Sequence, residues 1–140
     1  MTYCDLSDLL KMMPPAELAE LTAESGDEPD ETVVAEAIAK ADAELDAYLA
    51  GRYRLPLTET PPQVKSLSLD LAIYHLYSRR GVMPEVRRDR YRDAVAFLKE
   101  VAAGRARLEG AGGEPAGTLK EVAEVKSTPR TFSRGSQEDW

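Results

Sequence analysis

The densest group of side chains that could do chemistry is a cluster of arginines late in the sequence, Arg87, Arg88, Arg90 and Arg92. A guanidinium stays charged and donates a fork of hydrogen bonds, so such a cluster binds carboxylates or phosphates and does not transfer protons. The cluster lies near the predicted start of a helix, where positive charge opposes the helix dipole. We therefore expect an anionic partner here, and Arg87 and Arg88 are candidate interface residues.

A second basic group, Arg52 and Arg54, flanks Tyr53. In an extended segment both guanidiniums point to one side and the ring to the other. We expect the ring side to be buried and the guanidiniums to face an acidic partner, and we include all three residues among the interface candidates. Phe132 and Trp140 complete this set, because large aromatic side chains are typical anchors in a partner's pocket.

Asp70 is a candidate for a structural ion pair, because it lies in the middle of the largely apolar sequence KSLSLDLAIYHL. Burying an unpaired carboxylate is costly, so a buried Asp70 requires a positive partner. The candidates are Arg52, Arg54 and Arg80. The alternative is that Asp70 faces solvent.

Groups suited to catalysis or metal binding are scarce. His75 is the single histidine, and its place on an apolar helix favours a core or interface residue with its hydrogen bonds satisfied. Cys4 is the single cysteine, so the chain can form neither an internal disulfide nor a thiolate cluster. The glycine run at residues 110–113 lacks the following lysine of a phosphate-binding loop. We therefore expect no enzyme activity, no metal and no cofactor.

Proline, aspartate and glycine divide the chain into helices. Residues 5–22 are predicted to form two short helices separated at Pro14-Pro15, and Asp30 is a predicted N-cap for a helix over residues 31–50. Gly51 offers this helix a left-handed exit. The next helix opens at Pro61-Pro62 and ends at Gly81, and the last long helix runs from Pro84 to Gly104.

The apolar residues recur at helical spacing in all three long helices. Residues 31–50 carry one stripe, Val34, Ile38, Ala41, Leu45 and Tyr48. The middle helix is apolar on two sides, which indicates that it is the central one, and the last helix carries a stripe from Tyr91 to Val101/Ala102. We expect Leu45, Leu71 and Leu98 to share one interior. The predicted fold is all-α: a small antiparallel helical bundle of three long helices plus short N-terminal helices, with an extended C-terminal tail.

The division expected from composition is a helical domain over residues 1–109, followed by a linker and tail over residues 110–140. At 140 residues and 43% hydrophobic content the chain can bury one modest core. It has no apolar run of membrane-spanning length. We therefore expect no membrane partner. Because the single cysteine, Cys4, cannot form an internal disulfide, we also expect synthesis in a reducing cytoplasm.

Charge is unevenly distributed along the chain, whose net charge is -7. Residues 1–31 hold nine acidic side chains and one basic side chain, whereas residues 79–107 hold nine basic and four acidic ones. Copies of such a molecule could dock head to tail, and the alternative is two solvated helix faces of opposite sign. The acidic total opposes general binding to duplex DNA.

Three sequence segments, AYLAGRYRLPL (residues 47–57), DLAIYHLYSRR (70–80) and RYRDAVAFLKEVAAG (90–104), follow one another with short gaps. In this order they resemble a family of small proteins from Mu-like bacteriophages and prophages, similar to the head–tail connector adaptors of tailed phages. The resemblance runs from Tyr3 to the terminal RTFSRGSQEDW.

The resemblance implies a structural virion protein at the head–tail neck, assembled in the host cytoplasm. It implies a homo-oligomeric ring of twelve copies between portal and tail, in contact with the portal protein and other neck or tail proteins. Phage DNA would pass through the lumen without specific binding. The alternative function is a small helical nucleic-acid-binding regulator that uses the arginines between Arg79 and Arg92.

Overall fold

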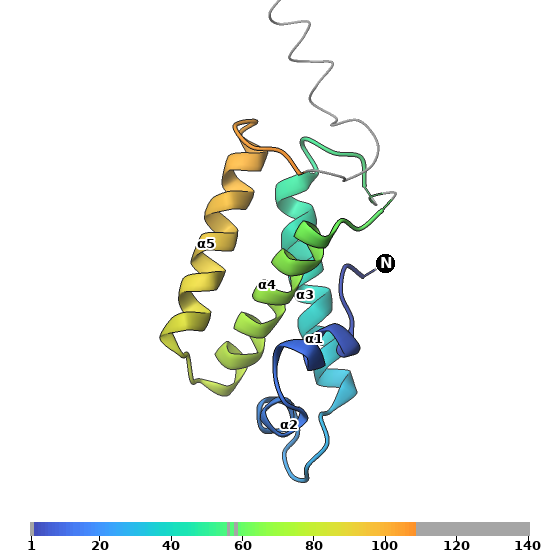
Figure 1. Cartoon of the computed structure of the whole chain (residues 1–140), viewed down its shortest axis with the longest axis vertical. Coiled ribbons are helices and arrows are strands. Elements are labelled where there is room, and N and C mark those ends of the chain that lie inside the picture. Colours follow the sequence, from blue (N-terminus) through green and yellow to red (C-terminus); the bar gives the residue numbers. More distant parts are fainter. Residues whose placement is uncertain (1, 56, 58, 109–140) are drawn as a thin grey trace, which may run out of the picture.

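The computed structural model describes residues 2–55, 57 and 59–108, and the five elements in this part of the chain are all α-helices (Figure 1). They are α1 (Leu6–Met12), α2 (Pro15–Thr22), α3 (Glu31–Leu49), α4 (Pro62–Arg80) and α5 (Glu85–Ala102). The three long helices run antiparallel to their neighbours in the chain, and α1 and α2 pack on α3 and α4. The all-α bundle is therefore confirmed. The tail over residues 110–140, with Phe132 and Trp140, lies outside the described residues.

Most helix ends are where local sequence signals place them. The Asp30 side chain accepts hydrogen bonds from the backbone N–H groups of Thr32 and Val33 and so caps α3. Helices α2 and α4 begin at prolines, whose missing N–H costs nothing in a first turn. Gly81 ends α4 with a φ of 82°, in the left-handed region that favours glycine.

The prediction for Gly51 is wrong. The glycines with positive φ in the described chain are Gly26, Gly81 and Gly104. Instead, the carbonyl of Leu49 accepts hydrogen bonds from the N–H groups of Arg52 and Tyr53, both at 2.9 Å. This right-handed turn satisfies the helix end, so no left-handed residue is needed there.

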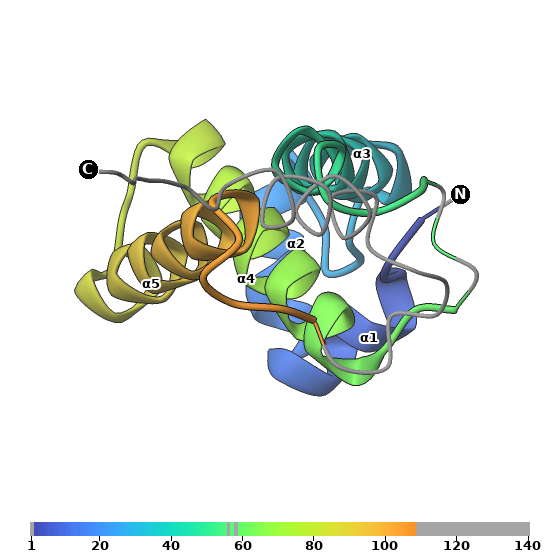
Figure 2. The same ribbon diagram turned by 90° about the horizontal axis from the view of Figure 1, so that it is seen from above.

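Helix α4 is the centre of the bundle and packs against all four other helices (Figure 2). The two apolar sides predicted from its sequence are both buried. Leu45, Leu71 and Leu98 are each 0% exposed and belong to one core cluster, as predicted. Burial of apolar side chains from three helices in one interior is the main stabilising term for a domain of this size.

Helix α5 is buried mainly through its C-terminal half. Its buried residues are Ala94, Leu98 and Val101, whereas Tyr91 is partly buried and Ala102, at the end of the predicted stripe, is exposed. The first two turns of α5 contain no buried residue. This end of the helix therefore presents much of its surface to solvent.

Candidate interaction surface

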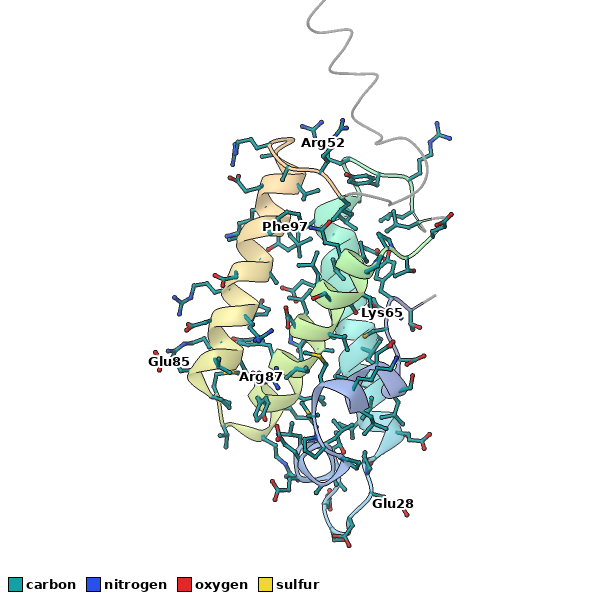
Figure 3. The ribbon with its side chains drawn as sticks, in the orientation of Figure 1. Glu28, Arg52, Lys65, Glu85, Arg87 and Phe97 are labelled. Atoms are coloured by element: carbon teal, nitrogen blue, oxygen red, sulfur yellow. The ribbon has the colours of Figure 1, made fainter. Side chains whose placement is uncertain are left out.

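The α4–α5 turn presents apolar side chains to solvent. Val82 is 61% exposed and Val86 is 59% exposed, the two highest values among the exposed large apolar residues in the described part of the chain. Figure 3 shows Glu85 and Arg87 at this corner of the molecule. Exposed apolar side chains among charged ones are a common feature of protein-binding surfaces.

The arginines predicted to bind a partner lie on different sides of α5. Arg87 is half-buried and close to Tyr77, where its charge opposes the rise in the pKa of Tyr77 caused by burial and by the Glu17 carboxylate. Arg88 and Arg92 are exposed. With the exposed Lys99 they follow one another at helical spacing (i, i+4, i+11), and we call these three residues the basic stripe.

Two other arginines of this region have structural roles. The Arg80 guanidinium donates hydrogen bonds to the backbone carbonyls of Glu20 and Ala23, both at 2.7 Å. Arg79 donates to the carbonyl of Leu21 at 3.3 Å. These carbonyls lie at the C-terminal end of α2, where cations satisfy unpaired acceptors and complement the helix dipole. Arg79 and Arg80 thus hold α2 against α4.

The expected partners of Asp70 are wrong. The Asp70 carboxyl lies half-buried on α4, and burial raises its pKa, while the nearby guanidiniums of Arg90 and Arg87 act in the opposite direction. Arg52, Arg54 and Arg80 have no part in this balance. No ion pair joins Asp70 to a cation in the described part of the chain, and the cations that act on its carboxyl, Arg90 and Arg87, both belong to α5.

A groove of about 520 Å³ runs between α4 and α5 beside Asp70. Its apolar lining comes from both helices: Leu67, Val86, Ala94 and Phe97. Its charged lining consists of Asp70, Asp89, Asp93 and Arg90. We call this feature the α4–α5 groove.

The Arg52–Arg54 segment is only partly a surface. Tyr53 is 5% exposed, and its hydroxyl accepts a hydrogen bond from the backbone N–H of Leu108 at 2.8 Å. The ring therefore belongs to the core of its own chain, which confirms the expected burial of the ring side, and Tyr53 presents almost no surface to a partner. Arg52 donates to the carbonyl of Ala102 at 3.4 Å, next to the end of α5. Arg54 is exposed.

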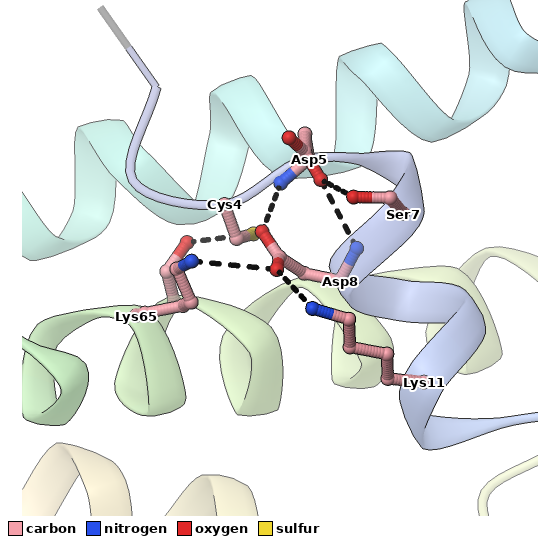
Figure 4. Close-up of polar contacts among 7 residues, drawn as sticks. Cys4, Asp5, Ser7, Asp8, Lys11 and Lys65 are labelled. Carbon is pink, nitrogen blue, oxygen red and sulfur yellow. Dashed lines mark hydrogen bonds and ion pairs between the residues drawn. The ribbon is translucent and has the colours of Figure 1, made fainter.

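The acidic side chains of the N-terminal region divide into those that cap or pair within the fold and those exposed in a loop. Asp5 and Asp8 form a capping box at the start of α1 (Figure 4). Asp8 also pairs with Lys65 of α4 at 3.4 Å, which ties α1 to the central helix. By contrast, the loop between α2 and α3 exposes Glu24, Asp27 and Glu28, and we call these three residues the acidic loop.

Two polar networks, one buried and one partly buried, were not foreseen from the sequence. The Asp42 carboxylate, 6% exposed, accepts hydrogen bonds from the Tyr3 backbone N–H at 3.1 Å and from Ser68 Oγ at 2.9 Å. Burial raises the pKa of Asp42, and these hydrogen bonds lower it. Cys4 Sγ lies 3.2 Å from Ser68 Oγ, and burial raises the pKa of its thiol to about 11. This network fixes the N-terminal segment on α3 and α4.

The second network joins the three long helices through Glu44. One carboxylate oxygen lies 3.0 Å from Nε2 of His75, and the other accepts a hydrogen bond from the Tyr91 hydroxyl at 2.8 Å. The Tyr91 ring stacks on Tyr74 with ring centroids 3.7 Å apart. His75 is thus satisfied inside the bundle, as its place on the apolar helix indicated.

The described residues contain no group of three or more His, Cys, Asp or Glu side chains placed to hold a metal ion. None of the described helices combines the length and hydrophobicity needed to cross a membrane. The groups that this part of the chain does assemble on its surface are the basic stripe, the acidic loop and the α4–α5 groove.

Comparison with known proteins identifies the family. The chain matches the family described as Bacteriophage Mu, Gp36 over residues 3–126. It is 32% identical over 139 residues, or 96% of each chain, to Gene product J of Escherichia phage Mu. It is 39% identical over 75 residues to the Mu-like prophage FluMu protein gp36 of Haemophilus influenzae, covering 54% of this chain and 52% of that protein. The chain therefore belongs to the bacteriophage Mu Gp36 family of phage proteins.

Proposed function

We propose that this protein is a structural component of a phage virion, a head–tail connector adaptor that forms a ring between portal and tail. Membership in a Mu phage family supports a phage role. The resemblance to connector adaptors points to the neck, to a ring of twelve copies and to contact with the portal protein. In this role the chain is not an enzyme, and phage DNA passes through the lumen without specific binding.

The observation that carries the proposal is the pair of exposed surfaces of opposite charge on one subunit. A closed ring of identical subunits needs two different, complementary patches on each copy. The acidic loop lies at one end of the bundle, where Figure 3 labels Glu28, and the basic stripe lies on a separate helix, α5. We assign these two surfaces to the contact between neighbouring copies.

A charge-swap experiment tests this contact. One variant carries Arg88→Glu and Arg92→Glu, and a second carries Asp27→Lys and Glu28→Lys. Each variant alone should fail to form rings in native mass spectrometry with a portal preparation, because like charges then face each other. A mixture of the two should form rings again, because each reversed patch meets its reversed partner.

A third variant is the control in the same native mass spectrometry experiment. Arg107→Glu changes an exposed charge outside both patches and should leave assembly unchanged. If both double variants assemble like the unmodified protein, the two surfaces are not the ring contact. If the unmodified chain stays monomeric with and without portal, the adaptor function itself is wrong.

The alternative of a nucleic-acid-binding regulator makes the opposite prediction. Arg79 and Arg80 are engaged with α2, which leaves fewer guanidiniums for phosphate contacts. A regulator should bind duplex DNA with an affinity that falls steeply with salt, whereas the adaptor should show no measurable binding. A steep salt dependence would favour the regulator.

A further inference from the structure

The α4–α5 groove has the chemistry of a receptor for a basic, aromatic segment. Half of its eight lining residues are apolar, and the other half are three carboxylates and one guanidinium, so the lining carries an excess of negative charge. Its volume of about 520 Å³ falls within the range of roughly 300–1,000 Å³ found for ligand pockets. The groove therefore favours an apolar group flanked by cations.

The carboxylates of the groove are incompletely neutralised within the described chain. Asp89 pairs with Arg92 at 3.5 Å, on a solvent-exposed part of the helix. Asp70 is half-buried with guanidiniums nearby and no ion pair, and no described residue pairs with Asp93. Val86, which lines the same groove from the first turn of α5, is 59% exposed. A segment that carries a cation next to an apolar side chain would pair with these carboxylates and cover Val86.

We propose that the occupant of the α4–α5 groove is residues 129–134 of this protein's own C-terminal tail, PRTFSR. Arg130, Phe132 and Arg134 are spaced two residues apart, so an extended segment presents all three side chains on one face. Phe132 contacts the apolar wall, and the two guanidiniums meet the carboxylates. Residues 126–135 carry three basic side chains and no acidic one.

The dimensions of groove and segment agree. From Val86 to Phe97, α5 rises roughly 16 Å at about 1.5 Å per residue, and an extended segment from Arg130 to Arg134 spans roughly 13 Å. The 21 residues between Leu108 and Arg130 can extend to roughly 70 Å, more than twice the length of α5. The segment can thus reach the groove of its own chain or of a neighbouring copy, and the proposal does not depend on the ring.

Cross-linking in the full chain tests the docking. A variant carrying Asp93→Cys and Ser133→Cys places one thiol in the groove and one in the segment. Cys4 does not compete, because its side chain is buried and its thiol pKa is raised to about 11. We expect oxidation at low salt to form a disulfide at least tenfold faster than in a control carrying Lys40→Cys and Ser133→Cys. Lys40 is an exposed residue in a smaller hollow between α3 and α4.

The product also identifies the chain that supplies the segment: a cross-linked monomer indicates its own tail, and a cross-linked dimer indicates a neighbour's. Either product supports the proposal. When Arg130→Glu and Arg134→Glu are added to the groove variant, the rate of disulfide formation should fall to that of the control. Adding Asp70→Arg and Asp89→Arg to that variant should restore the fast rate. Equal rates in groove and control variants would overturn the proposal and leave the groove to a segment of another protein.

Discussion

Replacing Leu98 with alanine should weaken the attachment of α5 more than any other single truncation in that helix. Leu98 is 0% exposed and is the largest of the three buried residues that hold α5 to the bundle. Removing three buried carbons costs roughly 2.4 kcal/mol at about 0.8 kcal/mol each. A residual cavity adds to this loss, and measured Leu→Ala changes reach about 5 kcal/mol. We expect a decrease of about 3–4 kcal/mol in the free energy of unfolding.

Urea unfolding followed by far-UV circular dichroism measures this change, with hydrogen exchange to locate it. Amide protection should fall most in α5, because α3 and α4 retain their contacts with each other and with the short helices. The matched control is Val86→Ala, which truncates an apolar residue of the same helix that is 59% exposed; it should change stability by less than about 0.5 kcal/mol. A loss at Leu98 no larger than the loss at Val86 would mean that the helix packing is wrong.

Three further predictions concern polar groups. Because burial raises the pKa of Asp70, the folded state disfavours its ionised form, so Asp70→Asn should raise the urea midpoint at neutral pH relative to Glu20→Gln, an exposed control. This gain should vanish as the pH falls below the ordinary pKa of aspartate, and a destabilised Asn variant would contradict it. Tyr91→Phe removes the hydrogen bond to Glu44 but keeps the stacked ring; it should cost about 1 kcal/mol in urea unfolding, and no loss would indicate an unformed bond. Cys4 should react with a thiol reagent at pH 8 at least tenfold more slowly in the folded protein than in urea, and equal rates would contradict its burial.

Local features of the sequence determined the helices, because their causes act over one or two turns. Asp30 can cap α3 through the next three residues, and Pro62 can start α4 without reference to distant parts of the chain. The apolar spacing in each long helix also predicted that Leu45, Leu71 and Leu98 face the interior. Gly51 shows the limit of such rules, since a right-handed turn closed the helix end without it.

The interaction surfaces were only partly predictable. The charge imbalance between residues 1–31 and 79–107 is visible in the sequence, but the sequence does not separate structural charges from exposed ones. The fold buries Asp8 against α4 and commits Arg80 to the end of α2, while the acidic loop and the basic stripe stay exposed. The α4–α5 groove could not be predicted, because its lining joins one face of α5 to Leu67 and Asp70 of α4, and only the fold brings these two helices together.

What only the tertiary structure decided is which distant polar groups meet. Glu44 contacts His75 and Tyr91 across 31 and 47 residues of sequence, and Cys4 meets Ser68 across 64. Such pairs depend on the rotation and height of each helix relative to its neighbours, which the packing of the whole core fixes. Asp70 illustrates the consequence: its sequence position left open whether the carboxyl is buried or faces solvent, and the charges around it were set by the way α5 lies on α4.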